Sequence, residues 1–363
     1  MLPDDVLVEI FDFSVNTVGD WPFDPSRNTW HILVHVCRRW RYLVFASPRR
    51  LNLRLVYEGH VLMSEELGAW PVLPVILNAS DSELHHPNLD QRWDNRAAAL
   101  ESEHYNRIRE IYIINMPNSR WERFAAAVQK PFPELTRLCV FMEDGDVASA
   151  LPDSILGGSA PRLRELELGG IPFPSMPKLL LSANGLVILS LSRIPDSGFI
   201  SPDAMATALT VMTRLESLTL LFDSPQSHPD PAGRPLPPPT RFVLPALTKL
   251  AFGGVCEYSE NLLARIDAPR LYNLFIGFFM DLNFEVPQLH RFIGHVEAFK
   301  VLNFAQVFIS DGSIGLRVVD HDTRLELRTK CSELDWQLSS LAQVCTSSSS
   351  FPLISALEEL EIR

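Results

Sequence analysis

Two stretches with the hydrophobic periodicity of a helix open the chain, separated by a polar connection over 14–29. The first stretch, residues 2–13, places its apolar side chains on one helical stripe: Val6, Leu7, Ile10 and Phe11. Pro3 suits a first helical turn, because it lacks the N–H that would have no partner there. Asp4 and Asp5 follow, where acidic groups complement the helix dipole. We therefore predict a helix that begins near Pro3.

The second stretch ends before Pro48, because the residue before a proline disfavours helical backbone. Its apolar positions recur at helical spacing: Trp30, Leu33, Val36, Cys37, Trp40 and Val44. A module of about 45 residues is marginal for an independent hydrophobic core. Part of its apolar surface must therefore contact either the rest of the chain or a partner.

The two halves of this module resemble an F-box, through LPDDVLVEIF at 2–11 and VCRRWRYLVFASPRRL at 36–51. The connection over 14–29 is longer than the usual loop of that family. The resemblance implies a helical module at 1–50 that binds a Skp-type adaptor and, through it, a cullin-based ubiquitin ligase. The residues that it assigns to the adaptor are Leu2, Pro3, Val6, Leu7, Ile10, Phe11, Leu33, Val36, Cys37 and Trp40. The alternative is a helical cap that packs on the following domain.

A motif of the form LxxLxL recurs through residues 51–363. Copies begin at Ile108, Leu135, Leu163, Leu186, Leu215, Leu247, Leu271 and Leu357. The first seven starts are 23 to 32 residues apart, a period typical of leucine-rich repeats, in which stacked strands bury their leucines. The array also resembles the repeats found behind many F-boxes. We predict an α/β fold: a short all-α F-box-like module at 1–50, then an irregular leucine-rich-repeat solenoid with a parallel sheet at 51–363.

Several segments between the repeats have patterns of their own. Residues 119–129 and 201–213 are predicted helices, and the second opens with a Ser-Pro pair that suits a cap and a first-turn proline. Residues 295–304 and 323–334 are further strand candidates in the part where the repeat phase is irregular. The proline-rich residues 224–245 predict an extended loop.

Alternate residues of each repeat strand point away from the buried leucines. The candidate target-binding residues on this outward face are Glu110, Tyr112, Arg137, Glu165, Glu167, Lys249, Asn273 and Phe275. Cys139 shares the face. Because several of these positions are acidic, the sequence favours a target that is partly basic.

The charge balance excludes one large class of partner. Thirty-two lysines and arginines against 44 aspartates and glutamates give a formal net charge of −12, which disfavours broad binding to the phosphates of nucleic acid. The five cysteines include no CxxC pair and their number is odd, which indicates a reducing compartment rather than a disulfide framework. The N-terminus is acidic where a secretory signal needs positive charge, and no apolar run is long enough to span a membrane. We expect a cytoplasmic or nuclear protein without a membrane partner.

No catalytic, cofactor or metal motif is present in the sequence. His85 and His86, and the run from Asp320 through His321 to Asp322, are predicted to lie in solvated loops. We therefore expect no enzyme activity and no cofactor. The resemblance implies the substrate-recognition subunit of an SCF-type ubiquitin ligase, with the F-box holding the adaptor and the repeats holding an unknown target protein. The alternative is a non-catalytic leucine-rich-repeat scaffold without a role in ubiquitin transfer.

Overall fold

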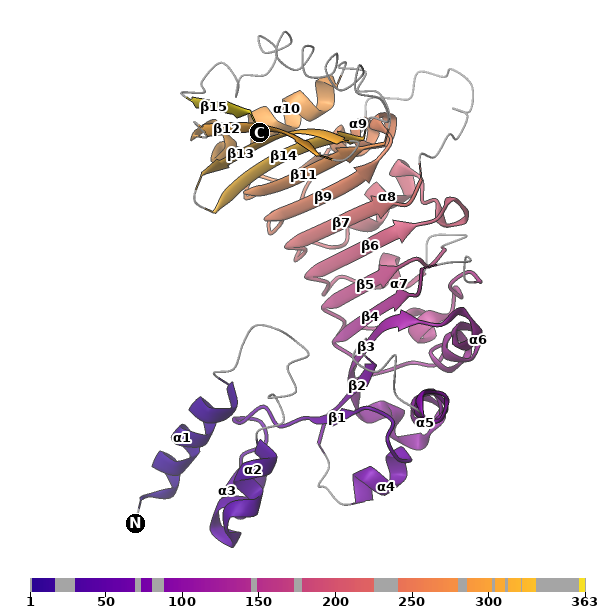
Figure 1. Cartoon of the computed structure of the whole chain (residues 1–363), viewed down its shortest axis with the longest axis vertical. Helices are drawn as coiled ribbons and strands as arrows, with labels where there is room; N and C mark the ends of the chain where they lie inside the picture. The colour runs from indigo at the N-terminus through magenta and orange to yellow at the C-terminus, as the bar shows by residue number, and fades with distance from the viewer. Residues whose placement is uncertain are drawn as a thin grey trace.

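The computed structural model describes residues 2–16, 30–68, 73–79, 88–144, 149–172, 178–224, 241–279, 286–301, 304–310, 313–320, 322–330 and 359–362. Figure 1 shows a group of short helices near the N-terminus, followed by a long stack of strands with helices along one side. The first helix and the last strand lie near opposite ends of the long axis of the molecule.

The N-terminal helices are α1 (Asp4–Asn16), α2 (Trp30–Val36) and α3 (Arg38–Ala46). The predicted start of α1 is confirmed, with the Leu7 amide donating to the Pro3 carbonyl at 3.1 Å. The second helical stretch is divided in two at Cys37, whose backbone is extended (φ −160°, ψ 169°). The Cys37 thiol then caps α3 by accepting from the Trp40 amide at 3.5 Å. The spacing of apolar residues does not indicate this break, because the spacing continues without interruption through Cys37.

The strands form one large sheet, which has thirteen strands in the described residues. Nine of them follow one another in chain order and pair in parallel: β1 (Leu55–Tyr57), β2 (Val75–Ala79), β3 (Ile108–Met116), β4 (Arg137–Met142), β5 (Glu165–Gly169), β6 (Ile188–Ile194), β7 (Ser217–Phe222), β9 (Lys249–Gly254) and β11 (Asn273–Phe278). The prediction of a mixed α/β fold with a parallel sheet is therefore confirmed. A minor two-stranded sheet pairs β8 (Phe242–Val243) with β10 (Ile266–Asp267).

The recurring LxxLxL segments lie side by side in register. Their central leucines form one continuous row across neighbouring strands: Leu138, Leu166, Leu189, Leu218, Leu250 and Leu274. Every member of this row is at most 2% exposed. Since each leucine contacts the equivalent residue of the next strand, no single strand can bury its apolar side alone.

Helices cover one side of the sheet, along its length in Figure 1. They are α4 (Met63–Gly68), α5 (Leu89–Glu101), α6 (Asn118–Ala127), α7 (Lys178–Ser182), α8 (Pro202–Leu209), α9 (Cys256–Leu263) and α10 (Pro287–His295). Shorter 3-10 helices occur at Glu103–Arg107, Ile155–Gly158, Asp196–Gly198 and Glu297–Val301. The predicted helices over 119–129 and 201–213 are confirmed as α6 and α8. Helix α5 was not predicted, because it buries Arg92, Asn95 and Arg96 among its apolar residues.

The C-terminal end of the sheet changes from parallel to antiparallel pairing. After β11 the strand order is β14 (Thr323–Lys330), β13 (Ser313–Asp320), β12 (Phe304–Ser310) and β15 (Glu359–Ile362). Strand β13 pairs antiparallel with both β14 and β12, whereas β14 pairs in parallel with β11, and β12 in parallel with β15. The strand predicted within 323–334 is confirmed over 323–330. The described part of 295–304 is mostly helical, and only its last residue belongs to β12. Residues 302–303 and 331–334 lie outside the described residues. Residues 225–240 of the predicted proline-rich loop lie outside the described residues, and Phe242–Val243, within its predicted bounds, form strand β8 instead.

The start of α8 offers a direct test of local capping. The Ser201 side chain accepts from the Ala204 amide at 3.2 Å, and Pro202 begins the helix. We expect Ser201→Ala to lower the free energy of unfolding by about 1 kcal/mol in urea denaturation, because this amide loses its partner. Thr207→Ala in the same helix is the control. Its hydroxyl donates only to the Asp203 carbonyl of the preceding turn, so a change within about 0.5 kcal/mol is expected. Equal losses in the two variants would contradict the capping role.

Candidate docking surface and strand face

The outer side of α1 carries a stripe of exposed apolar residues. Val6, Ile10 and Phe13 lie at intervals of four and three residues, so they share one face of α1, and Leu2 stands just before the helix, four residues from Val6. Their exposed fractions range from 38% to 74%. Single exposed apolar residues are normal on protein surfaces, but a whole exposed stripe indicates a contact surface.

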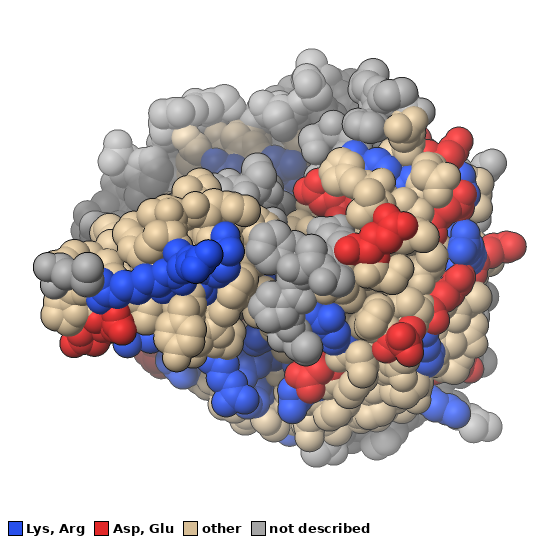
Figure 2. Space-filling model, turned by 90° about the horizontal axis from the view of Figure 1, so that it is seen from below, with Lys and Arg blue, Asp and Glu red and all other residues tan. Residues whose placement is uncertain are grey.

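Further large apolar residues are exposed on α2 and at its end. Ile32 and Val36 are more than half exposed, and Cys37 beside them is also exposed. On α3, Tyr42 is 72% exposed and lines a shallow hollow with Phe45. In Figure 2 the lobe on the left, which these helices form, has a largely uncharged surface with a band of basic residues across it and acidic residues at its lower left edge. We call Leu2, Val6, Ile10, Phe13, Ile32 and Val36 the helical apolar surface.

The predicted adaptor-binding residues divide into two groups. Leu2, Pro3, Val6, Ile10, Val36 and Cys37 are exposed, whereas Leu7, Phe11 and Leu33 are buried in the module's own core. Trp40 is half-buried and packs against Phe11, with ring centroids 4.7 Å apart. The stripe predicted for α1 is therefore split, since Leu7 and Phe11 point inward with Val8 and Val15. The buried residues lie in the core of the module, beneath the helical apolar surface.

The sequence argument missed Phe13 and Ile32, and the signal that locates them is simple. Both are large apolar residues that fall off the stripe that packs inside the module. When the helices of a small module carry apolar residues on two sides, the core of the module can bury only one of these sides.

Basic residues of α3 and the segment after it hold α1 in place. The Arg39 Nε donates to the Asp4 Oδ1 at 2.9 Å, and the Arg39 Nη2 donates to the Leu2 carbonyl at 2.6 Å. Arg50 forms an ion pair with Glu9. These contacts fix the orientation of the exposed stripe of α1 relative to α3.

The strand face opposite the buried leucines starts with paired charges. Glu110, Arg137 and Glu165 are neighbours in register on β3, β4 and β5. The Arg137 Nε lies 3.0 Å from the Glu165 Oε2, and its Nη2 lies 2.8 Å from the Glu167 Oε1. Glu110 is buried and pairs with Arg54. The acidic residues that suggested a partly basic target are therefore largely neutralised by arginines of the same face.

Two of the predicted outward residues, on β3 and β4, are less accessible to solvent than expected. Cys139 lies between Tyr112 and Glu167 in register and is only 1% exposed, because its short side chain is covered by these longer neighbours. Its burial raises the pKa of the Cys139 thiol far above the ordinary range. Tyr112 is half-buried.

Thiol reactivity reports this difference in exposure. We expect iodoacetamide to modify Cys37 readily and to leave Cys139 unmodified in the native chain, as measured by peptide mapping in a mass spectrometer. In urea both thiols become accessible and both are expected to react. Modification of native Cys139 at the rate of Cys37 would contradict the packing of the strand face.

The remaining predicted target-binding residues lie further along the same face. Lys249 of β9 is exposed and is paired in register with Asn273 of β11, which is half-buried. Phe275 is two residues further along β11 and is also half-buried. The structure thus places all the candidate target-binding residues on one side of the sheet.

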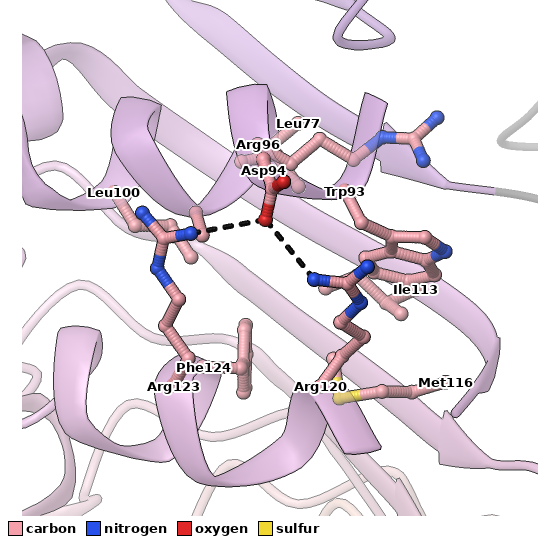
Figure 3. A pocket seen from close by; sticks show the side chains of 11 residues that line it. Leu77, Trp93, Asp94, Arg96, Leu100, Ile113, Met116, Arg120, Arg123 and Phe124 are labelled. Atoms are coloured by element: carbon pink, nitrogen blue, oxygen red, sulfur yellow. Dashed lines mark hydrogen bonds and ion pairs between the residues drawn. The ribbon is translucent and has the colours of Figure 1, made fainter. Parts of the chain in front are cut away.

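A narrow cavity between α5 and α6 is lined by a group of ion-paired side chains (Figure 3). Asp94 accepts from the Arg120 Nη1 at 3.0 Å and from the Arg123 Nη1 at 3.1 Å. Arg123 also donates to Glu101, and this hydrogen bond lowers the pKa of the Glu101 carboxyl. The rest of the lining is mostly apolar, including Trp93 and Phe124. The arrangement joins α5 and α6 through ion pairs between their side chains.

Within the described ranges, no group of three or more His, Cys, Asp and Glu side chains is arranged to hold a metal ion. His85, His86 and His321 lie outside these ranges, as does Cys345. None of the described helices has both the length and the apolar character needed to cross a membrane.

Comparisons with protein-family models, with curated proteins and with solved structures found no match to this chain.

Proposed function

We propose that this chain is the substrate-recognition subunit of an SCF-type ubiquitin ligase. In this proposal α1, α2 and α3 form an F-box that binds a Skp-type adaptor through the helical apolar surface. The strand array is a leucine-rich-repeat solenoid whose outward face binds the target protein. The chain itself is not an enzyme and acts in the cytoplasm or nucleus, where it raises the local concentration of target at the ligase.

The observation that carries the proposal is the exposure of Val6 and Ile10 on one side of α1, with Leu2 exposed just before the helix. The buried side of the same helix already completes the core of the module through Leu7 and Phe11. The exposed part of this stripe adds nothing to that core, and its contact with water is unfavourable. A groove between the helices of a partner is the usual way to cover such a face.

The separation between this surface and the strand face also suits a receptor. In Figure 1 the three helices lie at the N-terminal end of the molecule, and the strand stack extends away from them. A partner held by the helices therefore leaves the strand face of β7, β9 and β11 open for a second protein. Two independent surfaces on one chain are what a tethering subunit requires.

The test is co-purification of the full chain with a Skp-type adaptor from the same taxonomic group. We expect one adaptor per chain in size-exclusion chromatography, and slower alkylation of Cys37 in the complex than in the free chain. Addition of the matching cullin is then expected to give a ternary complex. If no adaptor co-elutes, the proposal is wrong. If the adaptor binds but the cullin never joins, the interaction scaffold without a ubiquitin role becomes the better account.

A further inference from the structure

Arg39 joins the start of α1 to the first turn of α3. Its Nε donates to the Asp4 Oδ1 at 2.9 Å, and its Nη2 donates both to that oxygen and, at 2.6 Å, to the Leu2 carbonyl. The two acceptors lie on either side of Pro3, where the helix begins. One planar guanidinium therefore holds both the side chain that opens α1 and the backbone that leads into it.

The position of Arg39 in its own helix is unfavourable. Arg38 and Arg39 occupy the first turn of α3, which contains no acidic residue. The N-terminal end of a helix carries a partial positive charge, so cations there lower its stability. Asp4 lies in the first turn of α1, where a carboxylate is favourable. The energetics of α3 therefore do not explain an arginine at residue 39, whereas its contact with α1 does.

The ion pair adds little to the stability of the module. The Asp4 and Arg39 side chains are 60% and 35% exposed, and ion pairs of this kind are weakened by solvent. The buried side chains of Leu7 and Phe11 pack α1 onto the other helices, and the Phe11 ring lies against Trp40 of α3. Arg39 instead adds order at the residues before α1, which are exposed and lie outside this core.

Leu2 is the exposed apolar residue that depends on this order. It stands before α1, outside the helical hydrogen bonds, and is 51% exposed four residues from Val6. An apolar side chain on a free backbone must be ordered when it binds a partner, and this ordering weakens binding. The hydrogen bond from Arg39 to the Leu2 carbonyl fixes the backbone before any partner arrives.

We propose that Arg39 is a positioning residue for the adaptor: it holds Leu2 and the start of α1 in the conformation that the adaptor binds. The inference rests on the proposed function and adds to it a residue that the resemblance does not assign to the adaptor. Arg39 acts through Leu2, so its loss weakens the complex without removing a contact from it. Part of the affinity of the helical apolar surface therefore depends on an arginine outside that surface.

Calorimetric titration of the full chain with a Skp-type adaptor measures this contribution. We expect Arg39→Met, which keeps the aliphatic stem and removes the donors, to weaken the adaptor affinity about tenfold. Its midpoint in urea is expected to stay close to that of the wild type, because the lost ion pair is exposed. Arg49→Met removes an exposed arginine of the same module and is expected to change the affinity less than about twofold. An equal loss in Arg49→Met would overturn the inference, because the change in net charge would then explain both results.

A double-mutant cycle with Leu2 distinguishes positioning from direct contact. Leu2→Ala removes the side chain that Arg39 positions, so adding Arg39→Met to it is expected to weaken binding less than about twofold further. The same loss in both backgrounds would mean that Arg39 contacts the adaptor or stabilises the module in general, and would overturn the inference. Arg39→Lys keeps the charge opposite Asp4 but not the planar fork, so we expect a smaller loss than in Arg39→Met. The lysine variant keeps the test informative if Arg39→Met does not fold.

Hydrogen exchange in the free chain separates this result from that of the proposed function. The Leu7 amide donates to the Pro3 carbonyl in the first turn of α1. Without adaptor, we expect Arg39→Met to exchange this amide at least about threefold faster than the wild type, as measured by mass spectrometry. Unchanged exchange would overturn the inference whether or not an adaptor binds. Faster exchange in the variant, together with no adaptor binding by the wild type, would overturn the proposed function and retain the ordering of α1 by Arg39.

Discussion

Replacing Ile10 with aspartate is expected to weaken binding of a Skp-type adaptor at least about a hundredfold and to leave the free energy of unfolding of the chain nearly unchanged. Ile10 is 47% exposed on the outer side of α1, so in the free chain its replacement empties no part of the core. In the complex the aspartate would be a buried charge without a partner, and the apolar contact of the isoleucine would be lost. Both effects act on the complex alone.

Leu181→Asp is the matched control for this experiment. Leu181 lies on α7, away from the N-terminal helices, and has the same exposed fraction as Ile10, 47%. We expect it to leave the adaptor affinity unchanged in a calorimetric or surface-binding titration. A similar loss in both variants, or no loss in Ile10→Asp, would refute the assignment of α1 as the contact helix. Leu7→Asp is a poor probe, because Leu7 is buried and its replacement would unfold the module.

Replacing Trp30 with alanine is expected to cost about 3–5 kcal/mol of stability. Trp30 is 1% exposed, and its indole Nε1 donates to the Arg54 carbonyl at 3.0 Å. It therefore joins α2 to the segment that leads into β1. The alanine variant leaves both a cavity and a carbonyl without its partner.

Urea denaturation followed by circular dichroism measures this loss. Tyr42→Ala is the control, because Tyr42 is large and aromatic but 72% exposed, and a change within about 0.5 kcal/mol is expected. If Trp30→Ala costs no more than Tyr42→Ala, the helices are not attached to the array through this residue.

The regular part of the fold could be predicted because its signal is local and repeated. Leu138, Leu166 and Leu189 each occupy the same place in their copies of the motif, and the structure pairs them in one register row. The end of the sheet could not be predicted in the same way. Strand β14 follows β12 and β13 in the chain but is the neighbour of β11, and β13 runs antiparallel to both β14 and β12, so the chain order and direction of the earlier strands no longer hold there.

Contacts between residues far apart in the chain explain the other differences. Helix α5 lacks a simple apolar pattern because Arg92 and Asn95 are buried, with Arg92 donating to the Glu58 carbonyl and Asn95 to the Gly59 carbonyl. The neutralised part of the strand face depends on Arg54 reaching Glu110, 56 residues later. Such pairs leave no periodic trace in a sequence.

The candidate docking surface was predicted in position but only partly in composition. The spacing of apolar residues locates the helices. Packing between the helices then determines which side of each helix faces the core. Leu7 and Phe11 of α1 contribute to that core, which leaves Val6 and Ile10 outside. Because all four lie on adjacent lines of one helix, periodicity does not distinguish the two pairs.

Calorimetric titration of the full chain with a Skp-type adaptor at several temperatures tests the central claim most directly. If the helical apolar surface is the contact, binding has one-to-one stoichiometry and a clearly negative change in heat capacity, because apolar area leaves water. We also expect little dependence on salt, since the contact residues Val6, Ile10 and Val36 carry no charge. Saturable binding with no change in heat capacity, or the absence of any binding, would contradict the account.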